Sequence, residues 1–262
     1  MADGIEVRGV SLEYGSSAAP VLAVKDASFS VAPSEFLCIV GPSGCGKTTI
    51  LNMLAGFLAP TRGDILIGGK RVGVGDAKTN RGVVFQDFAQ LFPWRTARAN
   101  VEFGLEMRGV GKAERRDTAM EYLRLVALEK FAGSYPHQLS GGMQQRVAIA
   151  RALAYNPGVL LMDEPFAALD AMTRDDMQSL VAGVWAATKK TIVYITHNVA
   201  EAVYLGDKVI VMATHPGTIR QEIRIPLARP RDPLSDEFIA MQRRVLASLG
   251  EVKARARAEA AE

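Results

Sequence analysis

A glycine-rich segment, GPSGCGKT at residues 41–48, places the tightest limits on how this chain can fold. It fits the pattern G-x-x-x-x-G-K-[ST] and lies between an apolar run, FLCIV at residues 36–40, and a stretch of helical character at 48–57. Phosphate-binding loops occur in this order of strand, loop and helix. The glycines let the backbone approach a phosphate, so that successive N–H groups and the helix N-terminus can bind anionic oxygens. The segment therefore predicts a parallel α/β core that binds phosphate groups.

Two side chains of this segment add specific chemistry to the backbone. Lys47 brings a positive charge to the terminal phosphates, and the hydroxyl of Thr48 can ligate Mg²⁺. The alternative interpretation, a glycine-rich turn with a solvated lysine, leaves the flanking strand and helix unexplained. The candidate nucleotide-binding residues here are Gly41, Pro42, Ser43, Gly44, Cys45, Gly46, Lys47, Thr48 and Thr49.

A second element, VLLMDEP at residues 159–165, delivers two acidic residues at the end of an apolar strand. Ligands of α/β folds bind in the crevice outside the carboxyl ends of the strands, which is where Asp163 falls. We expect Asp163 to hold Mg²⁺ and Glu164 to orient or deprotonate the attacking water. Alone, such a run usually marks only the end of a strand. The phosphate loop upstream favours the functional interpretation.

The rest of the chain alternates between strands and helices. Strand patterns occur at residues 5–14, 27–31, 82–85, 159–162 and 191–195, whereas residues 89–156 show helical spacing and no strand signal. After Pro226 the chain becomes rich in Arg, Pro and Ala, with one amphipathic helix expected at 236–249 and a solvated or frayed tail at 251–262. We therefore expect an α/β fold: a P-loop core with a parallel sheet, N-terminal antiparallel strands and an inserted helical subdomain.

Charge and composition narrow the possible partners. A formal net charge of +3 over 262 residues gives no argument for nucleic acid. The two cysteines, Cys38 and Cys45, form no disulfide framework or paired metal site, so a reducing cytoplasm is expected. The start of the chain, MADGIEVRGV, lacks the pattern of a signal peptide, and no run approaches the roughly 18 apolar residues that span a bilayer. Any membrane role is expected to depend on a partner.

A third motif, LSGGMQQR at residues 139–146, precedes a helical stretch at 147–154 and lies between the two motifs above. Elsewhere, Ser-Gly-Gly would be interpreted as a helix cap, Ser140, with flexible glycines. In this order the motif resembles the signature sequence of the ATP-binding cassette (ABC) family. The resemblance extends over residues 5–226 and implies that the ligands are ATP and Mg²⁺.

The resemblance also implies roles for isolated residues. Gln86 matches the glutamine loop, which in the family touches Mg²⁺ and the attacking water, and Asp170 lies in an Ala-Leu-Asp that matches the D-loop. His197 matches the switch histidine that contacts the γ-phosphate, and Tyr14 lies where the family places an aromatic ring against adenine. Taken alone, Tyr14 would mark a turn and His197 a structural strand end. The implied catalytic residues are Glu164, His197 and Gln86, and the implied metal ligands are Thr48, Gln86 and Asp163.

Family membership would also imply an assembly. In the family, the signature residues, here Ser140, Gly141 and Gly142, bind the ATP of the opposite subunit, so a cassette homodimer is expected. The other implied partners are transmembrane permease subunits and, indirectly, an extracytoplasmic solute-binding protein. The chain would then be peripheral, on the cytoplasmic face of the cell membrane. The expected domains are an ATP-binding domain at 5–228, with its helical subdomain at about 89–156, and a C-terminal helix and tail at 229–262.

The stretch QDFAQLFPW at residues 86–94 is a candidate docking surface for the permease. It is rich in apolar side chains for a loop, which suits a protein interface. The same side chains could instead be buried under the helical subdomain. They are Phe88, Leu91, Phe92 and Trp94.

Several segments resemble the cassettes of nitrate, sulfonate and taurine importers, among them MDEPFAALDAMTR and THNVAEAVYLGDKVIVM. Two departures are His215-Pro216-Gly217-Thr218, where these relatives usually carry arginines on both sides of Pro-Gly, and Asn198, where Asp is usual. Importers of pyrimidines or other small molecules have similar cassettes and remain an alternative. Soluble ABC ATPases of DNA repair or translation are a competing class. They are disfavoured, because such proteins usually need a long coiled coil or a second cassette. A binding module without turnover would not need both Glu164 and His197.

Overall fold

The computed structural model describes residues 2–15, 20–75, 80–87, 90–214 and 216–259, with side chains described up to Val252. The described chain divides into two compact units. One unit comprises residues 1–79 and 191–262, and the other comprises residues 80–190.

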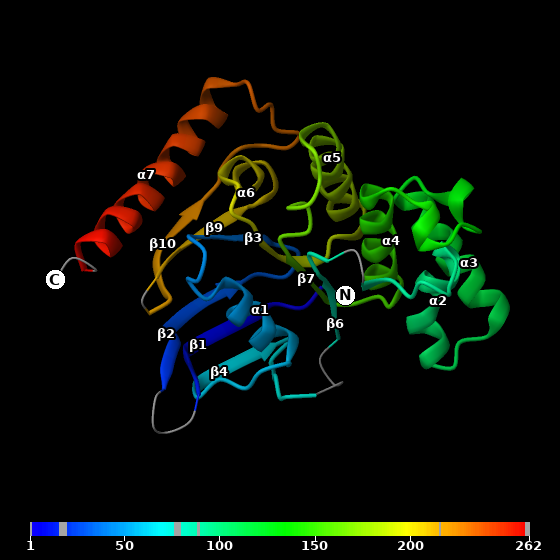
Figure 1. Cartoon of the computed structure of the whole chain (residues 1–262), viewed down its shortest axis with the longest axis horizontal. Helices are drawn as coiled ribbons and strands as arrows, with labels where there is room; N and C mark the ends of the chain where they lie inside the picture. The colour runs from blue at the N-terminus through cyan, green and yellow to red at the C-terminus, as the bar shows by residue number, and fades with distance from the viewer. Residues whose placement is uncertain (1, 16–19, 76–79, 88–89, 215, 260–262) are drawn as a thin grey trace. The chain divides into compact units, whose positions relative to one another are not determined.

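The first unit contains an antiparallel sheet of N-terminal strands in the order β2–β1–β4–β5. Figure 1 labels β2, β1 and β4 of this sheet. Buried and exposed side chains alternate along much of β1, as expected for a strand with one face on the core. Its strands are β1 (Ile5–Tyr14), β2 (Val21–Val31), β4 (Arg62–Ile67) and β5 (Lys70–Arg71).

The same unit contains the strand order β10–β9–β3–β8, in which β3 is parallel to both of its neighbours. All five residues of β3 and all five of β8 are buried, which explains their continuous apolar runs. The strands are β3 (Phe36–Val40), β8 (Thr191–Ile195), β9 (Lys208–Ala213) and β10 (Thr218–Arg224). The helices of this unit are α1 (Lys47–Ala55), α6 (Val199–Leu205) and α7 (Asp236–Glu259).

The second unit is mainly helical. Between its two strands, which pair in parallel, the described residues form only helices and turns (Figure 1). The strands are β6 (Arg81–Val84) and β7 (Val159–Asp163). The helices are α2 (Ala97–Met107), α3 (Lys112–Leu125), η2 (Glu129–Phe131), η3 (Pro136–Gln138), α4 (Gly141–Ala154) and α5 (Ala171–Thr188).

The expected fold class is confirmed, but several element boundaries differ from the expectation, most informatively in two helices. The helix after the signature motif begins at Gly141, earlier than the apolar periodicity indicated, because Ser140 caps it. Helix α7 continues to Glu259 through a stretch expected to be a frayed tail; this stretch is rich in Ala, Arg and Glu, which are good helix formers. No helix among the described residues is both long and apolar enough to cross a membrane.

Candidate functional site

The phosphate loop follows the carboxyl end of β3 and leads directly into α1. Gly44 and Gly46 have φ angles of 77° and 85°, which residues with a side chain rarely adopt. Gly46 is the N-cap of α1, so the first amides of the helix lie immediately after it. Such amides have no acceptor within the helix, and they carry the positive end of its dipole. The loop can therefore bind an anion through its backbone.

Lys47 is held inside this loop. Its side chain is only 7% exposed, and Nζ donates to the carbonyls of Gly41, at 2.9 Å, and Pro42, at 3.1 Å. Backbone carbonyls of the loop thereby fix the ammonium group of Lys47 at the start of the loop. A phosphate bound by the loop amides can share this charge without a large movement of the side chain.

Two neighbouring segments restrict the backbone of the loop. A Cβ built on Gly46 would lie 2.8 Å from Cγ2 of Val24 in β2, and one built on Gly217 would lie 2.4 Å from the carbonyl oxygen of Cys45. The turn before β10 therefore packs directly on the phosphate loop. Sequence reasoning missed this role of Gly217, which it treated only as part of a departure from relatives. His215 of that departure lies outside the described residues.

Cys45 is buried within the loop. Burial raises the pKa of its thiol, and the Lys47 ammonium group only partly opposes that shift. The side chain is therefore a neutral thiol at neutral pH that packs in the loop.

Tyr14 ends β1 and is 42% exposed, which leaves its ring accessible for stacking. Its hydroxyl lies 3.4 Å from Oγ1 of Thr49 in the first turn of α1. The structure therefore brings Tyr14 beside the phosphate loop, as its predicted contact with adenine requires.

His197 follows β8, the parallel neighbour of β3. Ile195 pairs with Ile39, and the amide of Thr196 donates to the carbonyl of Ile39 at 3.2 Å. Because parallel strands end at the same edge of a sheet, the turn with His197 lies beside the start of the phosphate loop. The imidazole is exposed.

In the second unit, too, a pair of parallel strands brings predicted site residues to one edge. Val84 of β6 pairs with Met162 of β7, so the residues after both strands meet at one edge. Gln86 therefore lies beside the Asp163–Glu164 pair. Glu164 has a φ of 41°, a left-handed conformation that is uncommon for a residue other than glycine. Because of this turn, the consecutive carboxylates of Asp163 and Glu164 point in different directions.

Two helix N-termini of the second unit carry the remaining predicted residues. Oγ of Ser140 accepts from the amide of Met143 at 3.3 Å and caps α4. Asp170 caps α5 by accepting from the amide of Thr173, at 3.0 Å, and from its hydroxyl, at 2.7 Å. A Cβ on Gly142 would lie 2.7 Å from Cγ2 of Thr173. The signature motif and the D-loop helix therefore pack against each other.

A buried amide connects the signature helix to the glutamine loop, and sequence reasoning missed it. Gln145 is fully buried, and its Nε2 donates to the carbonyl of Phe85 at 3.2 Å. Its Oε1 accepts from Gln90, which is also hydrogen-bonded to both backbone groups of Phe85. Phe85 directly precedes Gln86. The only signal in the sequence was a glutamine on the apolar side of a helix.

The candidate docking residues differ in exposure. Leu91 is 4% exposed, so it belongs to the core and not to a docking surface. Phe92 is half-buried and packs edge-on against Phe103, with ring centroids 4.6 Å apart. Trp94 is 71% exposed. Phe88 lies outside the described residues.

The proposed metal ligands fit Mg²⁺ by their chemistry. Thr48, Gln86 and Asp163 supply a hydroxyl, an amide and a carboxylate, which are the hard oxygen donors that Mg²⁺ prefers together with phosphate oxygens. Among the described residues, no group of three or more His, Cys, Asp or Glu side chains could hold a metal. Sites for Mg²⁺ and ATP need no such group, because the phosphates and waters supply most of the ligands.

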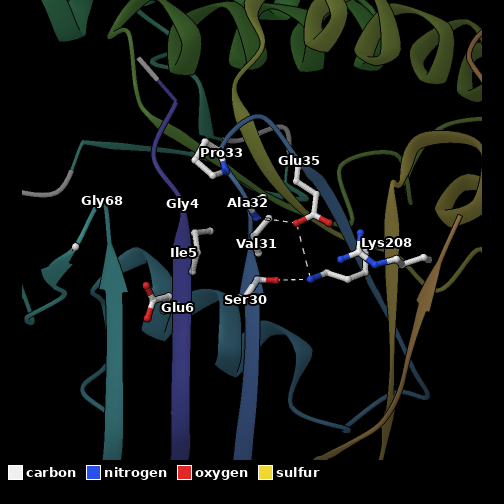
Figure 2. Close-up of a pocket in the computed structure, with 12 residues that line it drawn as sticks. Gly4, Ile5, Glu6, Ser30, Val31, Ala32, Pro33, Glu35, Gly68 and Lys208 are labelled. Atoms are coloured by element: carbon white, nitrogen blue, oxygen red, sulfur yellow. Dashed lines mark hydrogen bonds and ion pairs between the residues drawn. The ribbon is translucent and has the colours of Figure 1, made fainter. Parts of the chain in front are cut away.

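A separate cleft of the first unit, of about 430 Å³, lies where β1 and β2 approach β9 (Figure 2). The side chain of Lys208, only 5% exposed, donates to the carbonyl of Ser30 and lies 3.8 Å from a carboxylate oxygen of Glu35 and 3.7 Å from one of Glu222 (Figure 2 shows the first two contacts). The protein's own carboxylates therefore balance this buried charge.

Comparison with known proteins extends these observations. Residues 24–167 match the ABC transporter family. The chain is 50% identical over 227 residues to an uncharacterized ABC transporter ATP-binding protein of Methanocaldococcus jannaschii, covering 86% of this chain and 84% of the relative. It is 48% identical over 226 residues to a taurine import ATP-binding protein of Roseobacter denitrificans, covering 86% and 83% of the two chains. A nitrate import ATP-binding protein of Synechocystis sp. is 46% identical over 224 residues, covering 85% and 83%.

Solved structures show the same fold. The dimeric structure of a post-hydrolysis state of an ATP-binding cassette bound to ADP and Pi superimposes with a TM-score of 0.75 at 34% identity. The superposition covers 86% of this chain and 100% of that one.

Proposed function

This chain belongs to the ABC transporter family as an ATP-binding, ATP-hydrolysing subunit of an importer, and from that premise we propose that it drives uptake of nitrate, a sulfonate or taurine. In this proposal two copies form a cassette dimer on the cytoplasmic face of the membrane, bound to separate transmembrane permease subunits. The names of the taurine and nitrate import relatives support the choice of solute. An extracytoplasmic solute-binding protein would deliver that solute.

The pairing of β3 with β8 is the observation that carries the assignment of residues. It brings the phosphate loop and His197 to the same sheet edge, where the loop amides and Lys47 bind the phosphates of ATP. His197 contacts the γ-phosphate at the end that reacts. Preorganised donors of this kind stabilise the charge that develops during phosphoryl transfer.

The residues of the second unit complete the proposed chemistry. Glu164 orients or deprotonates the attacking water, helped by Gln86. Thr48, Gln86 and Asp163 would hold Mg²⁺, which would supply positive charge to the phosphates. Tyr14 stacks on adenine.

The proposed dimer explains why the signature motif and the D-loop lie at helix N-termini. Amides at the start of α4, after Ser140, can bind a phosphate of the ATP held by the opposite subunit. Gly141 and Gly142 keep that end of the helix free of side chains, and Asp170 lies beside it. A monomer would then lack half of each site and hydrolyse ATP poorly.

The test of this mechanism is the Glu164→Gln variant with ATP and Mg²⁺. Because the variant retains the binding residues but loses the carboxylate that activates water, we expect it to elute as an ATP-bound dimer in size-exclusion chromatography. Glu164→Gln combined with Lys47→Ala should elute as a monomer. A monomeric profile for Glu164→Gln at saturating ATP would contradict the proposed mechanism.

The partners and the solute require a different experiment. Affinity purification of the tagged chain from gently solubilised membranes should recover a multi-spanning permease. An associated solute-binding protein can then be titrated with taurine, nitrate, a sulfonate and a pyrimidine. Binding of the pyrimidine alone would replace the proposed solute. Recovery of only soluble proteins or nucleic acid, under conditions that preserve known membrane complexes, would contradict the permease partnership.

A further inference from the structure

A buried carboxylate lies one helical turn after His197. Glu201, in the first turn of α6, is only 4% exposed. A charge in such a place is costly unless it is well hydrogen-bonded. Its Oε2 accepts from the hydroxyl of Thr196 at 2.7 Å and from the hydroxyl of Tyr194 at 3.1 Å. Both donors come from the segment that leads into His197.

Thr196 connects this carboxylate to the backbone on both sides of the histidine. Its hydroxyl is a donor to Glu201 and an acceptor from the amide of Asn198, at 3.0 Å. Its own amide is bonded to Ile39 of β3. The residue before His197 and the residue after it are therefore fixed by the same side chain, which is 2% exposed.

The start of α6 is fixed in the same way. Oδ1 of Asn198 accepts from the amides of Ala200, at 2.9 Å, and Glu201, at 3.4 Å. Its backbone is thus held by Thr196 while its side chain caps the helix. A buried carboxyl group is costly to leave without hydrogen bonds, so the bonds from Thr196 and Tyr194 fix Glu201, and Glu201 anchors the arrangement.

The far end of α6 is also bound. Arg231 is 7% exposed, and Nη1 donates to the carbonyls of Val203, at 2.6 Å, Tyr204, at 3.0 Å, and Gly206, at 2.7 Å. These carbonyls lie at the C-terminal end of the helix, where a cation is favourable. Because both ends are held, α6 is a fixed base for the turn that precedes it.

We infer that Thr196 and Glu201 are positioning residues, which hold the turn so that the exposed imidazole of His197 points at the γ-phosphate. The inference rests on the proposed role of His197. Neither residue touches the nucleotide in this mechanism. A reacting group displaced by about 1 Å can lose on the order of 100-fold in rate, so the network sets turnover more than affinity.

Thr196→Val and Thr196→Ser form a matched pair for the test. Valine keeps the shape but removes the hydroxyl, whereas serine keeps it. In the full chain we expect Thr196→Val to lower kcat for ATP hydrolysis about tenfold, with KM within about twofold of the wild type. Thr196→Ser should retain most of the wild-type kcat. Urea unfolding of both variants establishes that each is folded under the assay conditions.

A double-mutant cycle with His197→Ala separates positioning from a general loss of stability. If Thr196 acts through the histidine, Thr196→Val should have no further effect on kcat once His197 is replaced. A loss of equal size in both backgrounds would overturn the inference, as would a wild-type kcat in Thr196→Val.

A second readout does not depend on turnover. The chain has three histidines, so the imidazole signals of the isotope-labelled full chain can be resolved by NMR, and His197→Ala assigns the one of interest. We expect Thr196→Val to shift the His197 signal without nucleotide and to leave that of His137 unchanged. An unshifted His197 signal would overturn the inference. Absence of ATP binding and hydrolysis in the wild type would instead count against the proposed function.

Discussion

Gly217 shows how a residue outside the nucleotide motifs can control the phosphate loop. Its amide donates to the carbonyl of Ala23 at 3.1 Å, and a Cβ would meet that oxygen at 2.6 Å as well as the carbonyl of Cys45. Both neighbours are backbone atoms, so neither can rotate away. The close approach needs a glycine.

We therefore expect Gly217→Ala to destabilise the chain by about 1–3 kcal/mol, since overpacking forces the backbone to shift. It should also weaken ATP binding, because the shift displaces the loop at Cys45. Urea unfolding and a titration with fluorescent ATP measure the two effects. Gly133→Ala is the matched control, because a Cβ there has no atom within 4 Å. Wild-type affinity in Gly217→Ala would contradict the packing argument.

At this scale the sequence was informative for residues in contiguous motifs and silent about others. Lys47 and Asp163 were predicted from motif spacing and a strand end, and His197 from the family resemblance. Glu201 and Gln145 carry no comparable pattern. Their importance comes from hydrogen bonds to backbone groups and side chains that only the fold brings near, such as Phe85, which is 60 positions from Gln145.

The stability of helix α5 depends on the hydrogen bonds between its N-cap, Asp170, and Thr173. The amide and hydroxyl of Thr173 lower the pKa of Asp170 by bonding to its ionised form. A carboxyl with a lowered folded-state pKa stabilises the fold above its unfolded pKa, and that contribution is lost as the pH falls through the folded pKa. The cap is thus fully effective at neutral pH.

We expect Asp170→Ala to lower the urea midpoint at pH 7, and we expect the difference from the wild type to shrink as the pH falls below the ordinary carboxyl range. Urea unfolding at a series of pH values measures this trend. Asp175→Ala, an exposed acidic position farther along the same helix, is the control for general loss of charge. A difference that stays constant into acid would show that the carboxylate does not cap α5.

The elements were more predictable than their ends. Apolar runs identified β3, β7 and β8 closely, because buried parallel strands have no polar face. The predicted start of α4 was too late, because the glycines at 141 and 142 give its first turn no helical pattern in the sequence. The alternative interpretation of Ser140 as a helix cap places the start correctly. Helix α7 was longer than expected because charged, alanine-rich segments are ambiguous between helix and tail.

For the whole molecule, the order of motifs along the chain predicted the fold class and the family. The sequence could not predict how sharply the exposure of the side chains would differ within QDFAQLFPW, from Leu91 in the core to the exposed Trp94. Phe92 lies under an arginine pair, with the guanidinium carbons of Arg95 and Arg151 at 5.9 Å and 5.7 Å from its ring centroid, so it is part of the packing. Trp94 packs on Phe92 at 5.6 Å and remains mostly exposed.

Trp94 is accordingly the residue through which docking to a permease can be tested without damage to the fold. Aromatic side chains are frequent anchors of protein interfaces, and replacement of such an anchor costs about 2 kcal/mol or more of binding. We expect Trp94→Asp to reduce recovery of the permease with the tagged chain at least about tenfold, which corresponds to roughly 1.4 kcal/mol. ATP binding and the urea midpoint should stay close to those of the wild type.

Phe92→Asp is the informative comparison, because loss of the ring removes its packing on Phe103 and should lower stability as well as recovery. Met107→Asp is the control for an exposed apolar residue of the same unit, since that side chain is 65% exposed and lies outside the 86–94 stretch. If Trp94→Asp and Met107→Asp recovered the permease equally well, the docking surface would have to lie elsewhere on the chain, and the exposure of Trp94 would need another explanation.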